Sequence, residues 1–100
     1  IFDLYKMKAF PYSQRDKNVF FKAEEFKTRI IELSEGGKIP ECRMDSYVMF
    51  IVIKGEAVVT ADSKKQVLDS GKCFISKPAV LSLKANTDTR ILGIQINKNK

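Results

Sequence analysis

The side chains best suited to chemistry in this sequence are the sulfur groups of Cys42 and Met44, which stand two positions apart. Soft sulfur ligands favour copper(I), and a cysteine thiolate can also act as a nucleophile. The chain contains no histidine, so neither an imidazole ligand nor a Cys-His pair is available to support these roles. We therefore expect Cys42 to be a buried, inert thiol. A soft-metal site at Cys42 and Met44, with Cys73 as a third ligand, is the alternative.

A regular spacing surrounds these two sulfur residues. Five residues separate Gly36 from Cys42, Met44 comes two positions later, Val48 follows after three more residues, and six further residues lead to Gly55. This spacing resembles the first motif of the cupin family, in which two histidines and a glutamate occupy the three positions between the glycines. The resemblance places Cys42, Met44 and Val48 where cupins have metal ligands.

A second segment, residues 71–86, resembles the second cupin motif less closely. Counting back from Asn86 places Ser82 at the position of the family's last histidine. Counting forward from Pro78 places Leu83 there instead. The glycine that follows this proline in the family is absent. The resemblance therefore leaves two registers for this strand.

The two registers predict different pocket chemistry. Alternate residues of a strand share a face, so an inward Ser82 would bring Lys84 inward with it. An inward Leu83 would instead group with Leu81 and Ala85 as a buried apolar face, which the hydrophobic pattern favours. An inward Lys84 could bind an anionic ligand. We favour the register with Leu83 inward.

The resemblance implies an all-β fold, a double-stranded β-helix or jelly-roll barrel of the small cupin type. Valine and leucine cannot bind a metal, and serine is a weak ligand. We therefore predict no iron, manganese, nickel or zinc, and no other cofactor. The residues expected to converge on one apolar ligand pocket are Cys42, Met44, Val48, Phe50 and one of Ser82 and Leu83.

The periodicity of the rest of the chain is that of short strands separated by turn residues. The predicted strands are residues 26–33, 47–53, 56–60, 72–75, 80–83 and 90–96. Residues 22–26 are the one segment that reads as a helical turn. Many short strands at regular spacing favour a sandwich or barrel over alternating strands and helices.

The strand at residues 47–53 is apolar on both faces. Val48, Phe50 and Val52 would face the barrel interior, while Met49, Ile51 and Ile53 would face outward. A strand that is apolar on both sides needs a cover beyond its own core. We expect a homodimer that buries this outer face.

Composition limits the class of protein. One hundred residues, 44% hydrophobic and 30% charged, are typical of one globular domain, here residues 1–100, with residues 1–17 as an outer strand or arm. The net charge of +6 comes from scattered lysines without a nucleic-acid motif, so no nucleic-acid partner is expected. No apolar run is long enough for a membrane span, so no membrane partner is expected. Two cysteines give no disulfide framework, which favours a cytoplasmic location.

The leading hypothesis is a non-catalytic or regulatory protein that binds a small organic molecule in the barrel. Apolar walls would leave sugar hydroxyls unpaired, so an aromatic or otherwise hydrophobic ligand fits better than a free sugar. One alternative is a metal-independent isomerase or lyase acting on a sugar or small acid. Others are a cupin metalloprotein with soft or substitute ligands, and a barrel that has lost its chemistry and only dimerises.

Overall fold

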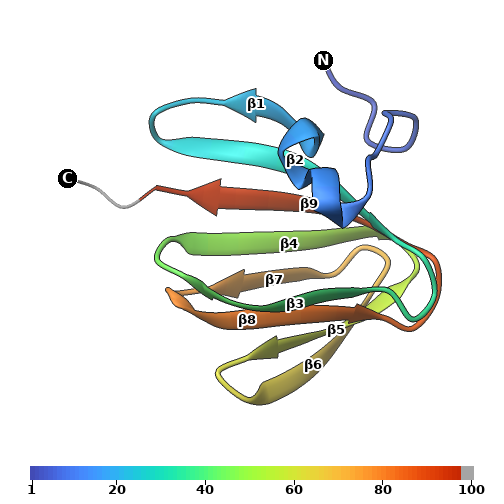
Figure 1. Cartoon of the computed structure of the whole chain (residues 1–100), viewed down its shortest axis with the longest axis vertical. Coiled ribbons are helices and arrows are strands. Elements are labelled where there is room, and N and C mark those ends of the chain that lie inside the picture. Colours follow the sequence, from blue (N-terminus) through green and yellow to red (C-terminus); the bar gives the residue numbers. More distant parts are fainter. Residues whose placement is uncertain (98–100) are drawn as a thin grey trace.

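The structure is a computed structural model that describes residues 1–97. Within this range nine strands form two antiparallel sheets that pack face to face (Figure 1). The larger sheet consists, in spatial order, of β1 (Val19–Lys22), β2 (Phe26–Leu33), β9 (Thr89–Ile96), β4 (Tyr47–Lys54) and β7 (Cys73–Ser76). The smaller sheet consists of β3 (Lys38–Met44), β8 (Ala79–Ala85), β5 (Glu56–Ala61) and β6 (Lys64–Asp69). The predicted all-β jelly-roll architecture is confirmed.

The six predicted strands are present as β2, β4, β5, β7, β8 and β9, and three further strands, β1, β3 and β6, were not predicted. Each of these three lies at a sheet edge and is largely exposed, so its sequence shows no strong hydrophobic alternation. The helical turn predicted for residues 22–26 is wrong. These residues form the turn between β1 and β2, closed by a bond from the Ala23 amide to the Phe26 carbonyl at 2.8 Å.

Two turns require backbone conformations that few residues adopt. Gly55, between β4 and β5, has a φ of +89°, and a Cβ atom there would lie 2.3 Å from the Asp88 carbonyl oxygen. Asp62 and Ser63, between β5 and β6, both have positive φ values, as a two-residue type I′ hairpin requires. The Asp62 side chain also accepts a bond from the Val80 amide at 2.9 Å, which ties this hairpin to β8.

The core fills the space between the sheets with inward-facing side chains from both. Its main cluster consists of Leu33, Val52, Ala57, Val59, Leu68, Leu83, Ala85 and Ile91. A smaller cluster of Val48, Ala79 and Leu81 lies toward the other end of the barrel, where Phe50 and Phe74 are only partly buried. Phe50 and Phe74 pack against both clusters and so join the two parts of the core.

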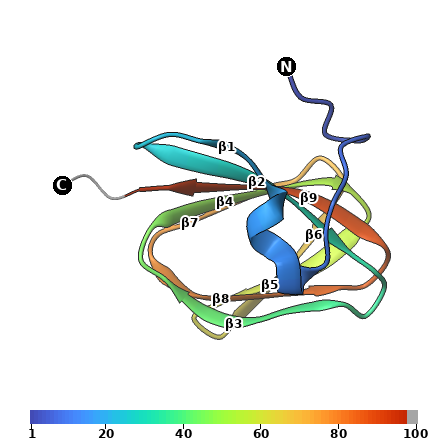
Figure 2. The same ribbon diagram turned by 45° about the horizontal axis from the view of Figure 1, so that its top comes forward.

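The N-terminal segment forms an arm and a short 3-10 helix, η1 (Tyr12–Asn18). Figure 2 shows η1 lying between the two sheets, next to β2. The arm before η1 runs along the outside of the larger sheet near the start of β9 (Figure 1). The first strand of the structure, β1, begins at Val19, after this segment. Among residues 1–97, no helix is both long and apolar enough to cross a membrane.

The alternation predicted for β4 holds up to its last residues. Val48 and Val52 are buried in the core, while Met49 and Ile51 lie on the outer face and are half-buried. The expectation that Ile53 lies on the same outer surface is wrong. The register with β9 shifts between Val52 and Lys54, and Ile53 is buried within the chain. The outer apolar face of β4 is therefore shorter than the sequence pattern indicates.

Candidate ligand-binding cavity

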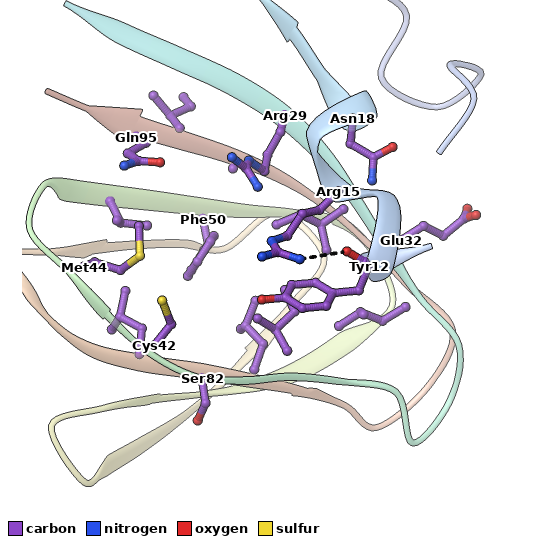
Figure 3. Close-up of a pocket in the computed structure, with 18 of the residues that line it drawn as sticks. Tyr12, Arg15, Asn18, Arg29, Glu32, Cys42, Met44, Phe50, Ser82 and Gln95 are labelled. Carbon is purple, nitrogen blue, oxygen red and sulfur yellow. Dashed lines mark hydrogen bonds between the residues drawn. The ribbon is translucent and has the colours of Figure 1, made fainter. Parts of the chain in front are cut away.

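A cavity of about 230 Å³ lies between the two sheets and is bordered on one side by η1 (Figure 3). Its apolar walls come from both sheets and consist mainly of Ile31, Leu33, Ile39, Met44, Val48, Phe50, Leu81 and Leu83. Polar side chains also border it, namely Tyr12, Arg15, Asn18, Arg29, Glu32, Cys42 and Gln95. A dry cavity of about 150 Å³ can hold benzene, so this volume suits a single ring or a short branched chain.

The six residues predicted from the sequence all border this one cavity: Cys42, Met44, Val48, Phe50, Ser82 and Leu83. They come from three strands, β3, β4 and β8. The expectation that Cys42 is buried is wrong: its side chain is exposed, because Cys42 lies on β3, an edge strand of the smaller sheet. Its thiol makes one long contact, a bond to the Arg43 carbonyl at 3.7 Å.

The register of β8 is the one counted forward from Pro78. Leu81, Leu83 and Ala85 are buried, whereas Lys84 is exposed on the outer face of the smaller sheet. Ser82 borders the cavity, but its hydroxyl points away from it in Figure 3. The alternative register, with Ser82 and Lys84 inward, is therefore wrong. That register would replace the three buried apolar side chains of β8 by the hydroxyl of Ser82 and a desolvated ammonium group of Lys84.

The cavity residues do not fit the metal ions that the cupin resemblance implies. Within residues 1–97, no three His, Cys, Asp or Glu side chains come together as a metal site would need. The cavity offers the sulfur groups of Cys42 and Met44, and the one carboxylate that borders it in this range, Glu32, is paired with Arg90 at 2.8 Å. Cys73, considered as a third sulfur ligand, does not border the cavity. Nitrogen and oxygen ligands for iron, manganese, nickel or zinc are therefore not assembled here.

Two arginines that the sequence analysis did not single out also border the cavity. Arg29 lies on β2 two positions before Ile31, so it belongs to the inward face of that strand. Arg15 comes from η1 and stacks on the ring of Tyr12, with its guanidinium carbon 4.6 Å from the ring centre. Figure 3 shows both arginine side chains pointing into the cavity. The alternation of β2 could have revealed Arg29, but nothing local places η1 over the barrel.

Gly93 on β9 makes room for this arrangement. It pairs with Arg29 on one side and Phe50 on the other. A Cβ atom at Gly93 would lie 3.3 Å from Cδ1 of Ile31, 3.4 Å from Cγ of Arg29 and 3.7 Å from the ring of Phe50. Because the side chain is missing, these three neighbours close over the strand, and any larger residue would push into the cavity wall.

Two buried polar side chains fix the N-terminal segment. Asn18 is buried and bridges back to the backbone of Phe10, accepting from its amide at 2.7 Å and donating to its carbonyl at 2.9 Å. Arg90 is buried on the other side of the sheet and donates to the Leu4 carbonyl at 2.6 Å and to the Met7 carbonyl. These contacts hold the arm against the sheet and η1 over the cavity.

Several solved structures share this architecture. No protein-family model and no curated protein shows a significant match to the sequence. Among solved structures, a cupin superfamily protein from Desulfitobacterium hafniense superposes with a TM-score of 0.75 at 15% identity, covering 80% of this chain and 74% of that one. The cupin domain of Schizosaccharomyces pombe Cnp3 gives 0.74 at 19% identity, covering 80% and 62%.

A salicylate 1,2-dioxygenase from Pseudaminobacter salicylatoxidans also superposes, with a TM-score of 0.68 at 18% identity. The match covers 72% of this chain and 21% of the dioxygenase chain. Identities this low establish a common fold and leave activity open, because one fold carries many functions. With its two facing antiparallel sheets and these structural neighbours, the protein has the cupin fold.

Proposed function

We propose that this protein binds a small, largely apolar organic molecule in the barrel cavity, in a non-catalytic or regulatory role. The observation that supports this most is the cavity of about 230 Å³, walled by aliphatic and aromatic side chains from both sheets. A concave, mostly apolar cavity with a few convergent polar groups is the usual form of a ligand site. The ordinary cupin role for this space, holding a metal, is not supported by the residues present.

The groups near the cavity also favour binding over metal-independent catalysis. General acid–base catalysis most often uses an imidazole or a carboxylate positioned at the substrate. Glu32 is held by Arg90, and the chain has no histidine. A nucleophilic role for Cys42 would need a neighbouring base to activate the thiol, and its contact is a backbone carbonyl. An isomerase or lyase is therefore the second hypothesis. Measured turnover of a sugar or small acid would favour it over non-catalytic binding.

The binding proposal is tested by an NMR titration with a neutral single-ring compound, benzyl alcohol. We expect chemical-shift changes at residues that border the cavity. Gly93→Val should abolish them, because the new side chain enters a wall whose nearest atom is 3.3 Å from a Cβ. Thr60→Val, on β5 outside the cavity, is the control and should bind as the wild type does. Equal binding by Gly93→Val, or no cavity shifts in the wild type, would contradict the proposal.

We also propose that two copies pair through the outer face of the larger sheet. Tyr47, Ile75 and Ile96 are 47%, 63% and 40% exposed on neighbouring strands of this face. Glu32 and Arg90 of the same face lie at the end where the arm docks and pair with each other, and Lys54, the register partner of Arg90 on β4, lies at that end too. An uncharged apolar sheet face is self-complementary and can bury itself against a second copy about a two-fold axis. The cytoplasmic location and the lack of nucleic-acid and membrane partners stay predictions.

A further inference from the structure

We propose that the ligand of the cavity is a compact carboxylic acid whose carboxylate is bound by Arg29, with Arg15 of η1 as a second cation. This inference rests on the proposed function and specifies its ligand. The cation expected from the sequence for such a role, Lys84, points to the outer surface. The two arginines supply the positive charge from different elements, one from β2 and one from η1.

Arg29 is a charged group without a charged partner in an apolar setting. Its side chain is half-buried on the inward face of β2, opposite Gly93 and beside Ile31. Within residues 1–97, the ion pairs are made by Arg43, Lys72 and Arg90, and none includes Arg29. A guanidinium that is partly removed from water is stabilised by an anion at its planar fork of donors.

The other charges around the cavity leave this position open to a ligand. Glu32 is directed to Arg90 at 2.8 Å, so it does not neutralise the arginines of the cavity. Arg15 makes a long bond of 3.4 Å to the Tyr12 carbonyl and stacks on the Tyr12 ring, which leaves most of its donors unused. Arg15 is exposed at the border of the cavity, and its positive charge adds to the attraction that Arg29 exerts on an anion there.

The shape of the cavity decides which anion fits. The guanidinium fork matches a carboxylate with two parallel hydrogen bonds. The remaining walls are apolar, including the Phe50 ring, whose centre is 6.3 Å from that of Phe74 in a nearly parallel stack. A cavity of about 230 Å³ holds one ring or a short branched chain attached to the carboxylate. We therefore assign single-ring aromatic acids, with benzoate as the simplest probe.

The test compares benzoate with its neutral isostere benzamide by NMR titration of the full chain. Wild type should bind benzoate about 10- to 100-fold more tightly than benzamide, because hydrogen bonds to a charged group exceed those to a neutral one by this order. Arg29→Gln should remove the preference and keep the benzamide affinity. Arg29→Lys retains the charge without the fork and should keep part of the preference. Arg43→Gln removes the same charge from an exposed site outside the cavity and should bind as the wild type does.

The outcomes separate this inference from the proposal on which it rests. Benzamide binding with no preference for benzoate, or a preference that survives Arg29→Gln, would overturn the carboxylate assignment and leave the cavity as a binding site. Cavity shifts with neither compound, nor with benzyl alcohol, would overturn both proposals. Thermal unfolding of each variant shows whether its barrel is folded, and Arg29→Lys carries the comparison if Arg29→Gln is not.

Discussion

Replacing Arg90 by methionine tests whether one buried guanidinium holds the N-terminal arm. Arg90 is 6% exposed and donates hydrogen bonds to the carbonyls of Leu4, at 2.6 Å, and Met7. Its third partner is a carboxylate oxygen of Glu32 at 2.8 Å. Methionine keeps the packing of the aliphatic stem but donates no hydrogen bond, so the substitution isolates the polar contribution.

We expect Arg90→Met to lower the free energy of unfolding by about 2–4 kcal/mol. The two bonds from the charged donor to the arm carbonyls contribute about 1.5–3 kcal/mol each. The pair with Glu32 adds less than about 1 kcal/mol, because that carboxylate is 56% exposed and solvent screens it. The released arm regains backbone freedom and its carbonyls regain water, which brings the net loss below the sum of these terms.

Denaturant unfolding followed by circular dichroism measures this loss, and hydrogen exchange followed by mass spectrometry reports on the arm. Exchange should become faster before Phe10, whereas η1 should stay protected because Asn18 still binds the Phe10 backbone. Arg43→Met is the matched control: Arg43 pairs with Asp45 at 3.7 Å and both side chains are mostly exposed, so we expect a change below about 0.5 kcal/mol. A loss below about 1 kcal/mol in Arg90→Met, or unchanged exchange in the arm, would refute the reasoning.

Three further predictions follow from the same structure. Gly55→Ala should lower the free energy of unfolding by more than about 3 kcal/mol or prevent folding, because its Cβ would lie 2.3 Å from the Asp88 carbonyl oxygen. Gly71→Ala has a similar φ but nothing within 4 Å of its Cβ, so denaturant unfolding should show a loss of about 1–2 kcal/mol. Ile75→Lys should convert the proposed dimer to a monomer in sedimentation, while Val67→Lys, similarly exposed on the smaller sheet, should not; a monomeric wild type at micromolar concentration would exclude the dimer. Elemental analysis should find no stoichiometric iron, manganese, nickel or zinc, and one such ion per chain would contradict the sequence argument.

The strands that could be predicted from the sequence are those whose side chains alternate between core and surface. β2 and β9 show this pattern: Ile31 and Leu33 of β2 and Ile91 of β9 face the core. The missed strands β3 and β6 are held at sheet edges by backbone pairing with β8 and β5, and most of their side chains stay in solvent. Backbone hydrogen bonds do not require particular side chains, so such strands are hard to recognise from the local sequence.

The candidate site was predictable to a similar extent. The motif spacings and the strand alternation were enough to bring Cys42, Met44, Val48, Phe50 and Leu83 to one cavity. The sequence left the register of β8 open, and packing decided it, because burying three apolar side chains is favourable whereas burying the ammonium group of a lysine is costly.

The sequence by itself determined the all-β class, the inward faces of the main strands and the absence of imidazole ligands. Only the tertiary structure decided the polar side of the cavity. Arg15 reaches it because Arg90 and Asn18 fix the N-terminal segment, and the bond from Arg90 to Leu4 joins residues 86 positions apart. Alternation and turn chemistry act over a few neighbouring residues, whereas the position of this arm depends on contacts that form only when the two ends of the chain meet.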